Sequence, residues 1–179
     1  IKVGDVNGNA QTNSLMTSEE RTTPSVFQIQ TEDMDLVVGQ HYILSFSTNQ
    51  LAGIEGYQFT LTYDGITIEK LQSGIAGVEN FGLQKKGEGY ITTSWNQELP
   101  KSKPLATGKQ QLFVLQFTAQ ENGKLSEQLQ LINRPTPREA YDENGEMMDV
   151  ELVFTTPLYS DDFELYQNVP NPFYDKTAI

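Results

Sequence analysis

Asp5, Asn7 and Asn9 alternate within the opening stretch GDVNGNA, and they carry the clearest ligand chemistry in the sequence. Calcium prefers several hard oxygen ligands on a tight turn, and D-x-N-x-N supplies the first three ligands of an EF-hand-type loop. Two positions depart from that loop, because Ala10 stands where the sharp turn favours glycine and Met16 where a bidentate carboxylate is expected. The spacing leaves two alternatives, a calcium site or a turn closed by Asx hydrogen bonds without an ion.

Residue types suited to catalysis are few. His41 is the only histidine, and at the start of an apparent strand we expect it to be exposed or to cap a turn. The sequence contains neither a GxSxG elbow nor a phosphate-cradling glycine loop. Glycoside hydrolysis needs two facing carboxylates, and nothing in the sequence selects a pair. The carboxylates considered are Glu55, Asp64, Glu69, Glu88 and Glu98. The sequence therefore predicts no enzymatic activity, and an enzyme using two surface carboxylates is the weakest alternative.

Charge and composition exclude several classes of protein. The 179 residues carry 24 acids against 12 bases, a formal net charge of −12, and no cysteine. A nucleic-acid partner requires a basic surface that displaces counterions, so this charge argues against one. The absence of cysteine excludes disulfides and thiolate metal sites. No apolar run approaches the ~18 residues of a membrane span.

The elements that must position these residues are short strands. Eight segments alternate apolar with polar residues and are bounded by Gly, Pro, Asn or Asp, which predicts β-structure. These segments are 26–30, 41–48, 54–64, 66–71, 90–95, 112–120, 125–132 and 149–155. Alternation places Tyr63 and Trp95 in the core, and 112–120 is apolar on both faces. The acid-rich stretch Glu139–Glu151 is expected to be a solvated loop, with calcium binding as an alternative. We predict an all-β antiparallel sandwich of about nine strands.

The order of these segments carries a resemblance to a known family. LVVG at 36–39 is followed by GYQFTLTYD, YITTSW and LFVLQFTAQENG, and then by REAYDENGE running into DVELVF. This layout resembles cohesin domains and the related carbohydrate-binding modules, which share a jelly-roll sandwich. The resemblance implies a cohesin-like domain over residues 24–157. Another Greek-key sandwich with the same alternation is the alternative.

The two ends of the sequence resemble parts of other modules. The GDVNGNA loop resembles the start of a dockerin repeat, so residues 1–23 are expected to be a dockerin-like remnant or linker. FELYQNVPNPFYDKTAI resembles the opening of the C-terminal sorting domain of type IX secretion, preceded by a linker from residue 158. A proline-rich tail that docks on the sandwich is the alternative for 158–179. We expect a fragment of a larger secreted or cell-surface bacterial protein.

The cohesin resemblance implies a partner-binding sheet face. In cohesins the corresponding face docks the dockerin partner, and the outward positions here are uncharged. They are Gln58, Thr60, Thr62, Thr92, Ser94, Gln128 and Gln130. We expect a non-catalytic interaction or adhesion module, or a spacer, with no cofactor other than calcium. Polysaccharide binding is the alternative, and Tyr63, Tyr90 and Trp95 are its aromatic candidates.

Overall fold

The computed structural model describes residues 25–97 and 107–156. The predicted calcium loop at Asp5, Asn7 and Asn9, Glu98, and the tail from residue 158 lie outside the described residues. No helix in the described ranges is long and apolar enough to cross a membrane.

The described chain is built almost entirely of strands. The strands are β1 (Val26–Glu32), β2 (Asp35–Leu36), β3 (His41–Thr48), β4 (Ile54–Tyr63), β5 (Ile66–Ser73), β6 (Phe81–Gly82), β7 (Tyr90–Asn96), β8 (Gln110–Ala119), β9 (Gly123–Lys124), β10 (Leu129–Ile132), β11 (Glu139–Asp142) and β12 (Met147–Thr155). Three single-turn helices interrupt them, η1 (Val78–Asn80), η2 (Lys86–Glu88) and α1 (Leu125–Gln128). The predicted all-β sandwich is confirmed.

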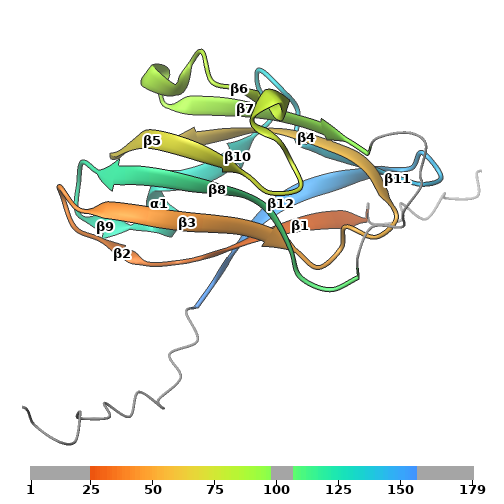
Figure 1. Ribbon diagram of the computed structural model, residues 1–179, viewed down its shortest axis with the longest axis horizontal. Helices are drawn as coiled ribbons and strands as arrows, with labels where there is room; N and C mark the ends of the chain where they lie inside the picture. Colours follow the sequence, from red (N-terminus) through yellow and green to blue (C-terminus); the bar gives the residue numbers. More distant parts are fainter. Residues whose placement is uncertain (1–24, 98–106, 157–179) are drawn as a thin grey trace, which may run out of the picture.

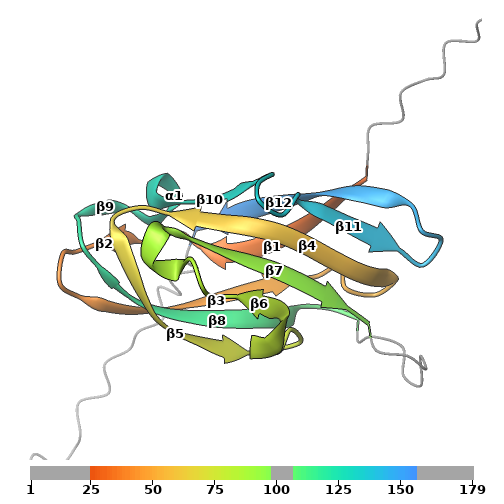
Figure 2. The ribbon, with the colours of Figure 1, turned by 90° about the horizontal axis from the view of Figure 1, so that it is seen from above.

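One curled ten-stranded sheet makes both layers of the sandwich. Its order is β5-β8-β3-β1-β12-β11-β4-β7-β6, with β10 also paired to β4, while β2 and β9 form a separate small ladder. The layer of β5, β8 and β3 lies against the layer of β4, β7 and β6 (Figure 1, Figure 2). β1 joins the layers, because it pairs with β12 along its whole length and with β3 only at Gln30–Ser47. The β1–β12 pair is parallel, a departure from the antiparallel expectation.

Aromatic side chains hold the two layers together. Phe113 of β8 stacks on Phe46 of β3 with ring centroids 4.3 Å apart. It also meets Phe81 of β6 at 5.0 Å and Phe59 of β4 at 6.3 Å, so one ring contacts both layers. Leu112 through Leu115 are all buried, which confirms that β8 is covered on both faces. Burial of this apolar area is the main stabilising contribution to a fold of this kind.

Two sequence expectations about the C-terminal third were wrong. Residues 125–132 do not form one strand: α1 occupies the first half, and only β10 pairs with β4. Glu139–Glu151 is not simply a solvated loop, because it contains β11, which pairs with both β4 and β12. The buried Ala140 between half-buried Glu139 and exposed Tyr141 fits a short strand with one covered face.

Candidate interaction face

The outward side of β4 and its neighbours forms the candidate interaction face, hereafter the front face. Strand β4 lies at its centre and pairs with β7 on one side and with β10 and β11 on the other. The register places Gln58 between Ser94 and Glu139, and Thr62 between Tyr90 and Gln130. The structure therefore brings together the predicted side chains of β4, β7 and β10.

Alternation along β4 explains why these side chains point outward. Tyr57, Phe59, Leu61 and Tyr63 are buried in the core, so the residues between them face the other way. On β7 the same period buries Ile91 and Trp95 and turns Thr92 and Ser94 outward.

Thr60 does not lie on an open surface, contrary to the expectation. It is 0% exposed, because the segment between β10 and β11 crosses over it. The Thr60 hydroxyl donates to the Thr136 carbonyl at 2.8 Å and accepts from the Thr136 N–H at 2.9 Å. The middle of the front face is thus covered by residues near Thr136, tied down by two hydrogen bonds.

Gln128 also departs from the predicted face, because it ends α1 instead of lying on a strand. Its backbone carbonyl accepts from the Asp64 N–H at 3.0 Å, and its amide packs where a Cβ on Gly65 would stand. Gly65 has a φ of +62°, so both its conformation and the space beside it favour glycine. Gln128 therefore supports the β4–β5 turn.

A carboxylate on the front face was missed by the sequence reasoning. Glu139 on β11 accepts a hydrogen bond from the Gln58 amide at 3.3 Å and one from the Tyr141 hydroxyl at 2.9 Å, both on Oε2. The hydrogen bond to Glu139 raises the pKa of the Tyr141 hydroxyl. The signal in the sequence was the alternation of Glu139, Ala140 and Tyr141, which the expected loop obscured. The face is therefore not free of charge.

The aromatic residues considered for sugar stacking are mostly inside. Trp95 is 7% and Tyr63 8% exposed, which confirms their place in the core. Burial raises the pKa of Tyr63 to about 12, and its hydroxyl donates to the Lys86 carbonyl at 2.6 Å. Tyr90 is half-buried at the β7 end of the face.

The two ends of the front face differ in character. One end of the front face lies near α1 and the β2–β9 ladder (Figure 2). A groove of about 890 Å³ there is lined by residues of the β4–β5 turn, the 86–90 segment and α1. Asp64 and Glu88 border it: Asp64 accepts the Gly65 N–H, and Glu88 pairs with Lys85 at 2.6 Å. At the other end, Tyr141 and Met147 face each other across β11 and β12.

The outward side of β5, β8 and β3, hereafter the back sheet, holds His41. Its Nδ1 lies 2.9 Å from Glu69 Oε1 and 2.9 Å from the Thr118 hydroxyl, which also donates to Glu69. In a nucleophilic triad the hydroxyl and the carboxylate occupy opposite ring nitrogens. Here both meet the same nitrogen on an exposed surface, so this cluster lacks that geometry.

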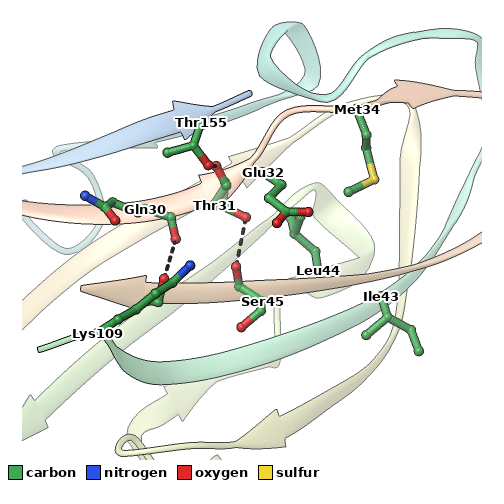
Figure 3. A pocket seen from close by; sticks show the side chains of 10 residues that line it. Gln30, Thr31, Glu32, Met34, Ile43, Leu44, Ser45, Lys109 and Thr155 are labelled. Atoms are coloured by element: carbon green, nitrogen blue, oxygen red, sulfur yellow. Dashed lines mark hydrogen bonds between the residues drawn. The ribbon is translucent and has the colours of Figure 1, made fainter. Parts of the chain in front are cut away.

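A small cavity opens where β1 and β3 diverge (Figure 3). Its volume is about 140 Å³, and Gln30, Met34, Ser45 and Lys109 are among the residues around it. Thr31 donates to the Ser45 carbonyl at 3.0 Å across the gap, which ties the strands where their ladder is broken. A space of this size suits ordered water better than an organic ligand, for which pockets usually exceed ~300 Å³.

Metal-ligating side chains do not gather in the described residues. No group of three or more His, Asp or Glu that could hold a metal ion occurs there. The acidic turn after β11 is organised by its own backbone: Asp142 Oδ1 accepts the N–H groups of Asn144 at 2.9 Å and Glu146 at 2.8 Å. These hydrogen bonds, led by the one from Glu146, outweigh the effect of burial and lower the pKa of Asp142.

Comparisons with known proteins identify the fold through solved structures. No protein-family model matches the sequence, and no curated protein matches it. A chain of the Coh-OlpA–Doc918 complex, a type I cohesin–dockerin complex from Clostridium thermocellum, aligns with a TM-score of 0.53 and 14% identity, covering 72% of this chain and 100% of that one.

Two further structures give the same result. A chain of the Coh-OlpC–Doc435 complex from the same organism aligns with a TM-score of 0.53 and 15% identity, covering 75% of this chain and 94% of that one. The seventh ScaB type I cohesin from Pseudobacteroides cellulosolvens aligns with a TM-score of 0.50 and 17% identity, covering 74% and 96%. The described domain therefore has the cohesin-like jelly-roll fold.

Proposed function

We propose that this chain is a non-catalytic interaction module that binds a protein partner of the dockerin kind through its front face. The observation that carries the proposal is the register of β4 with β7, β10 and β11, which gathers Gln58, Thr62, Ser94 and Gln130 on one outward surface. The fold supports it, since two of the similar structures are cohesin–dockerin complexes. Function does not follow from fold alone, so the surface chemistry must carry the argument.

The chemistry of the front face suits a protein partner. Its hydroxyl and amide groups offer donors and acceptors, and Glu139 holds the Gln58 amide in a defined position. A partly ordered polar surface loses less side-chain freedom on binding, so more of the interaction energy appears as affinity.

The same face is less suited to a polysaccharide. Sugar rings stack on exposed aromatic planes, whereas Trp95 and Tyr63 are buried and Tyr90 is half-buried. The groove beside Tyr90 is lined by both polar and apolar residues, a mixture that suits a sugar, so polysaccharide binding is the second arm of the test.

The setting of the module is part of the proposal. The sorting-type motif in FELYQNVPNPFYDKTAI supports export to the cell surface, and GDVNGNA supports a calcium loop built on Asp5, Asn7 and Asn9. Calorimetry of the full chain with calcium, with Asp5→Ala as the matched variant, tests the loop. Heat of binding in the wild type that is absent in the variant supports the calcium loop. A wild-type titration that shows no heat of binding contradicts the calcium hypothesis.

Binding to immobilised dockerin domains tests the proposed function. The panel includes Doc918 and Doc435, and the full 179-residue chain is the analyte. We expect at least one domain to bind, and Gln58→Arg with Ser94→Arg to weaken that binding by about 100-fold, because two long cations would stand within the interface.

Gln116→Arg on β8 of the back sheet is the matched control and should bind like the wild type. Polysaccharide arrays are probed in parallel. No binding to any dockerin domain would contradict the proposal, as would binding that the front-face arginines leave unchanged. Retention on a polysaccharide alone would replace it with the carbohydrate-binding alternative.

A further inference from the structure

We propose that Tyr141 and Met147 form the apolar anchor of the front face, and that the partner meets them with an apolar ridge flanked by basic side chains. This inference rests on the proposed function and names the chemistry of the partner at the β11–β12 end of the face. It assigns a role to a part of the chain that resembled a solvated loop in the sequence.

Register and exposure point to this pair. Tyr141 on β11 lies directly across from Met147 on β12, so their side chains leave the same side of the sheet as neighbours. Tyr141 is 39% and Met147 57% exposed, so two large apolar side chains meet solvent side by side. On its other side Tyr141 pairs with Gly56 of β4, which has no side chain to cover the ring.

The ring of Tyr141 is held in place before any partner arrives. Its hydroxyl donates to Glu139 Oε2 at 2.9 Å, and the same oxygen accepts from Gln58 at 3.3 Å. The network joins the exposed ring to the predicted binding residue Gln58. Tyrosine and methionine are enriched at the centres of protein interfaces, and a pre-oriented ring loses little freedom on binding.

Other exposed apolar residues in the described ranges lie elsewhere. Ile43 is 70% exposed but stands on β3 in the back sheet, Val37 and Val38 lie in the turn after β2, and Val78 lies in η1. None of these is on β11, which pairs with β4, or on β12, which pairs with β11. Tyr141 and Met147 are thus the apolar pair that continues the front face.

Charge around the anchor indicates what the partner must carry. From Glu139 to Thr156 the sequence contains six acids and neither lysine nor arginine, namely Glu139, Asp142, Glu143, Glu146, Asp149 and Glu151. Arg138 neutralises part of this surface through Asp149, 3.6 Å away. Basic side chains beside the partner's apolar ridge would complement the remaining carboxylates and speed association at low salt.

The test uses whichever dockerin domain binds the full wild-type chain most tightly. Tyr141→Ala and Met147→Ala should each weaken binding by about 30-fold, the loss typical of an interface anchor. Tyr141→Phe keeps the ring and should lose about 3-fold, as expected for one hydrogen bond. Ile43→Ala on the back sheet is the matched control and should bind like the wild type. Thermal unfolding of each variant shows whether the fold is kept.

Each outcome decides one claim. If Gln58→Arg with Ser94→Arg abolishes binding while Tyr141→Ala and Met147→Ala stay within about 2-fold of the wild type, the anchor is wrong and the front face stands. If no dockerin domain binds, the proposed function fails and the anchor fails with it. An association rate that is the same at low and high salt would contradict the claim that the partner carries basic side chains beside its apolar ridge.

Discussion

The front face and the back sheet come from the same alternating pattern, but their outward surfaces differ. On the front face, the segment at Thr136 covers Thr60, and Glu139 links Gln58 to Tyr141 through hydrogen bonds. On the back sheet, His41 and Ile43 stand exposed on β3 with no segment folded across them. The back sheet's main polar contact is the exposed cluster at Glu69.

This difference shows what a strand pattern can and cannot reveal about a surface. Alternation decides which side chains leave the core. It does not decide which of them are then covered or linked into a network, because those contacts join residues far apart in the chain. Thr60 and Thr136 are 76 positions apart, and Gln58 and Glu139 are 81 apart.

The largest expected effect comes from Phe113, the ring that contacts both layers. Phe113→Ala should lower the free energy of unfolding by about 3–5 kcal/mol, because it removes buried apolar area and leaves a cavity. Urea denaturation measures the loss. The two layers should lose stability together, because one core supports both of them. A loss below about 1 kcal/mol would mean that the layers do not depend on this contact.

A smaller effect is expected where the front face is covered. Thr60→Val keeps the shape of the side chain but leaves the N–H and carbonyl of Thr136 without their partner. The expected cost is about 1–3 kcal/mol, measured by urea denaturation. Thr92→Val, at the position paired with Thr60 on β7, is the matched control and should cost less. Equal losses in the two variants would contradict the proposed role of the Thr136 cover.

The smallest effect is expected on the back sheet. The hydrogen bond from Thr118 is the largest influence and, with the nearby His41, lowers the pKa of Glu69 despite the opposing effect of burial. Because the pKa of Glu69 is lowered, its contribution to folding stability is complete above the ordinary carboxyl pKa of 4.5. That contribution is lost as the pH falls through the lower pKa of the folded state.

Glu69→Gln should therefore reduce stability slightly at neutral pH and flatten its decline in acid, while partner binding stays unchanged. Urea midpoints at neutral and acid pH measure the first effect, and the dockerin panel measures the second. Weaker partner binding by Glu69→Gln would indicate that the interface lies on the back sheet instead of the front face.

Much of the fold was predictable because the strands are amphipathic and bounded by turn residues. Tyr57, Phe59 and Leu61 alternate with polar residues, and the structure confirms a strand, β4, that buries all three. The order of segments that resembles cohesins also predicted that these strands share one sheet, whereas the register of Gln58 with Ser94 and of Thr62 with Gln130 is seen only in the structure.

The errors have a common physical cause in the C-terminal third. LSEQLQLI alternates like a strand, yet its first half forms α1. A single helical turn is too short to show a 3.6-residue hydrophobic period, so the sequence pattern does not reveal it. REAYD is short and acidic, and it becomes β11 only because β4 and β12 offer edges on both sides. Pairing between distant strands overrides local composition, so the short alternation of Glu139, Ala140 and Tyr141 was too weak a signal to assign Glu139 and Tyr141 to the face.

Amide hydrogen exchange of the full chain, free and bound to a dockerin domain, tests the central claim most directly. The front-face account predicts slower exchange on binding in β7, β10, β11 and the segment around Thr136, with β3 and β5 unchanged. Gln58→Arg with Ser94→Arg should remove the protection. Protection confined to the back sheet strands β3, β8 and β5 would contradict the account.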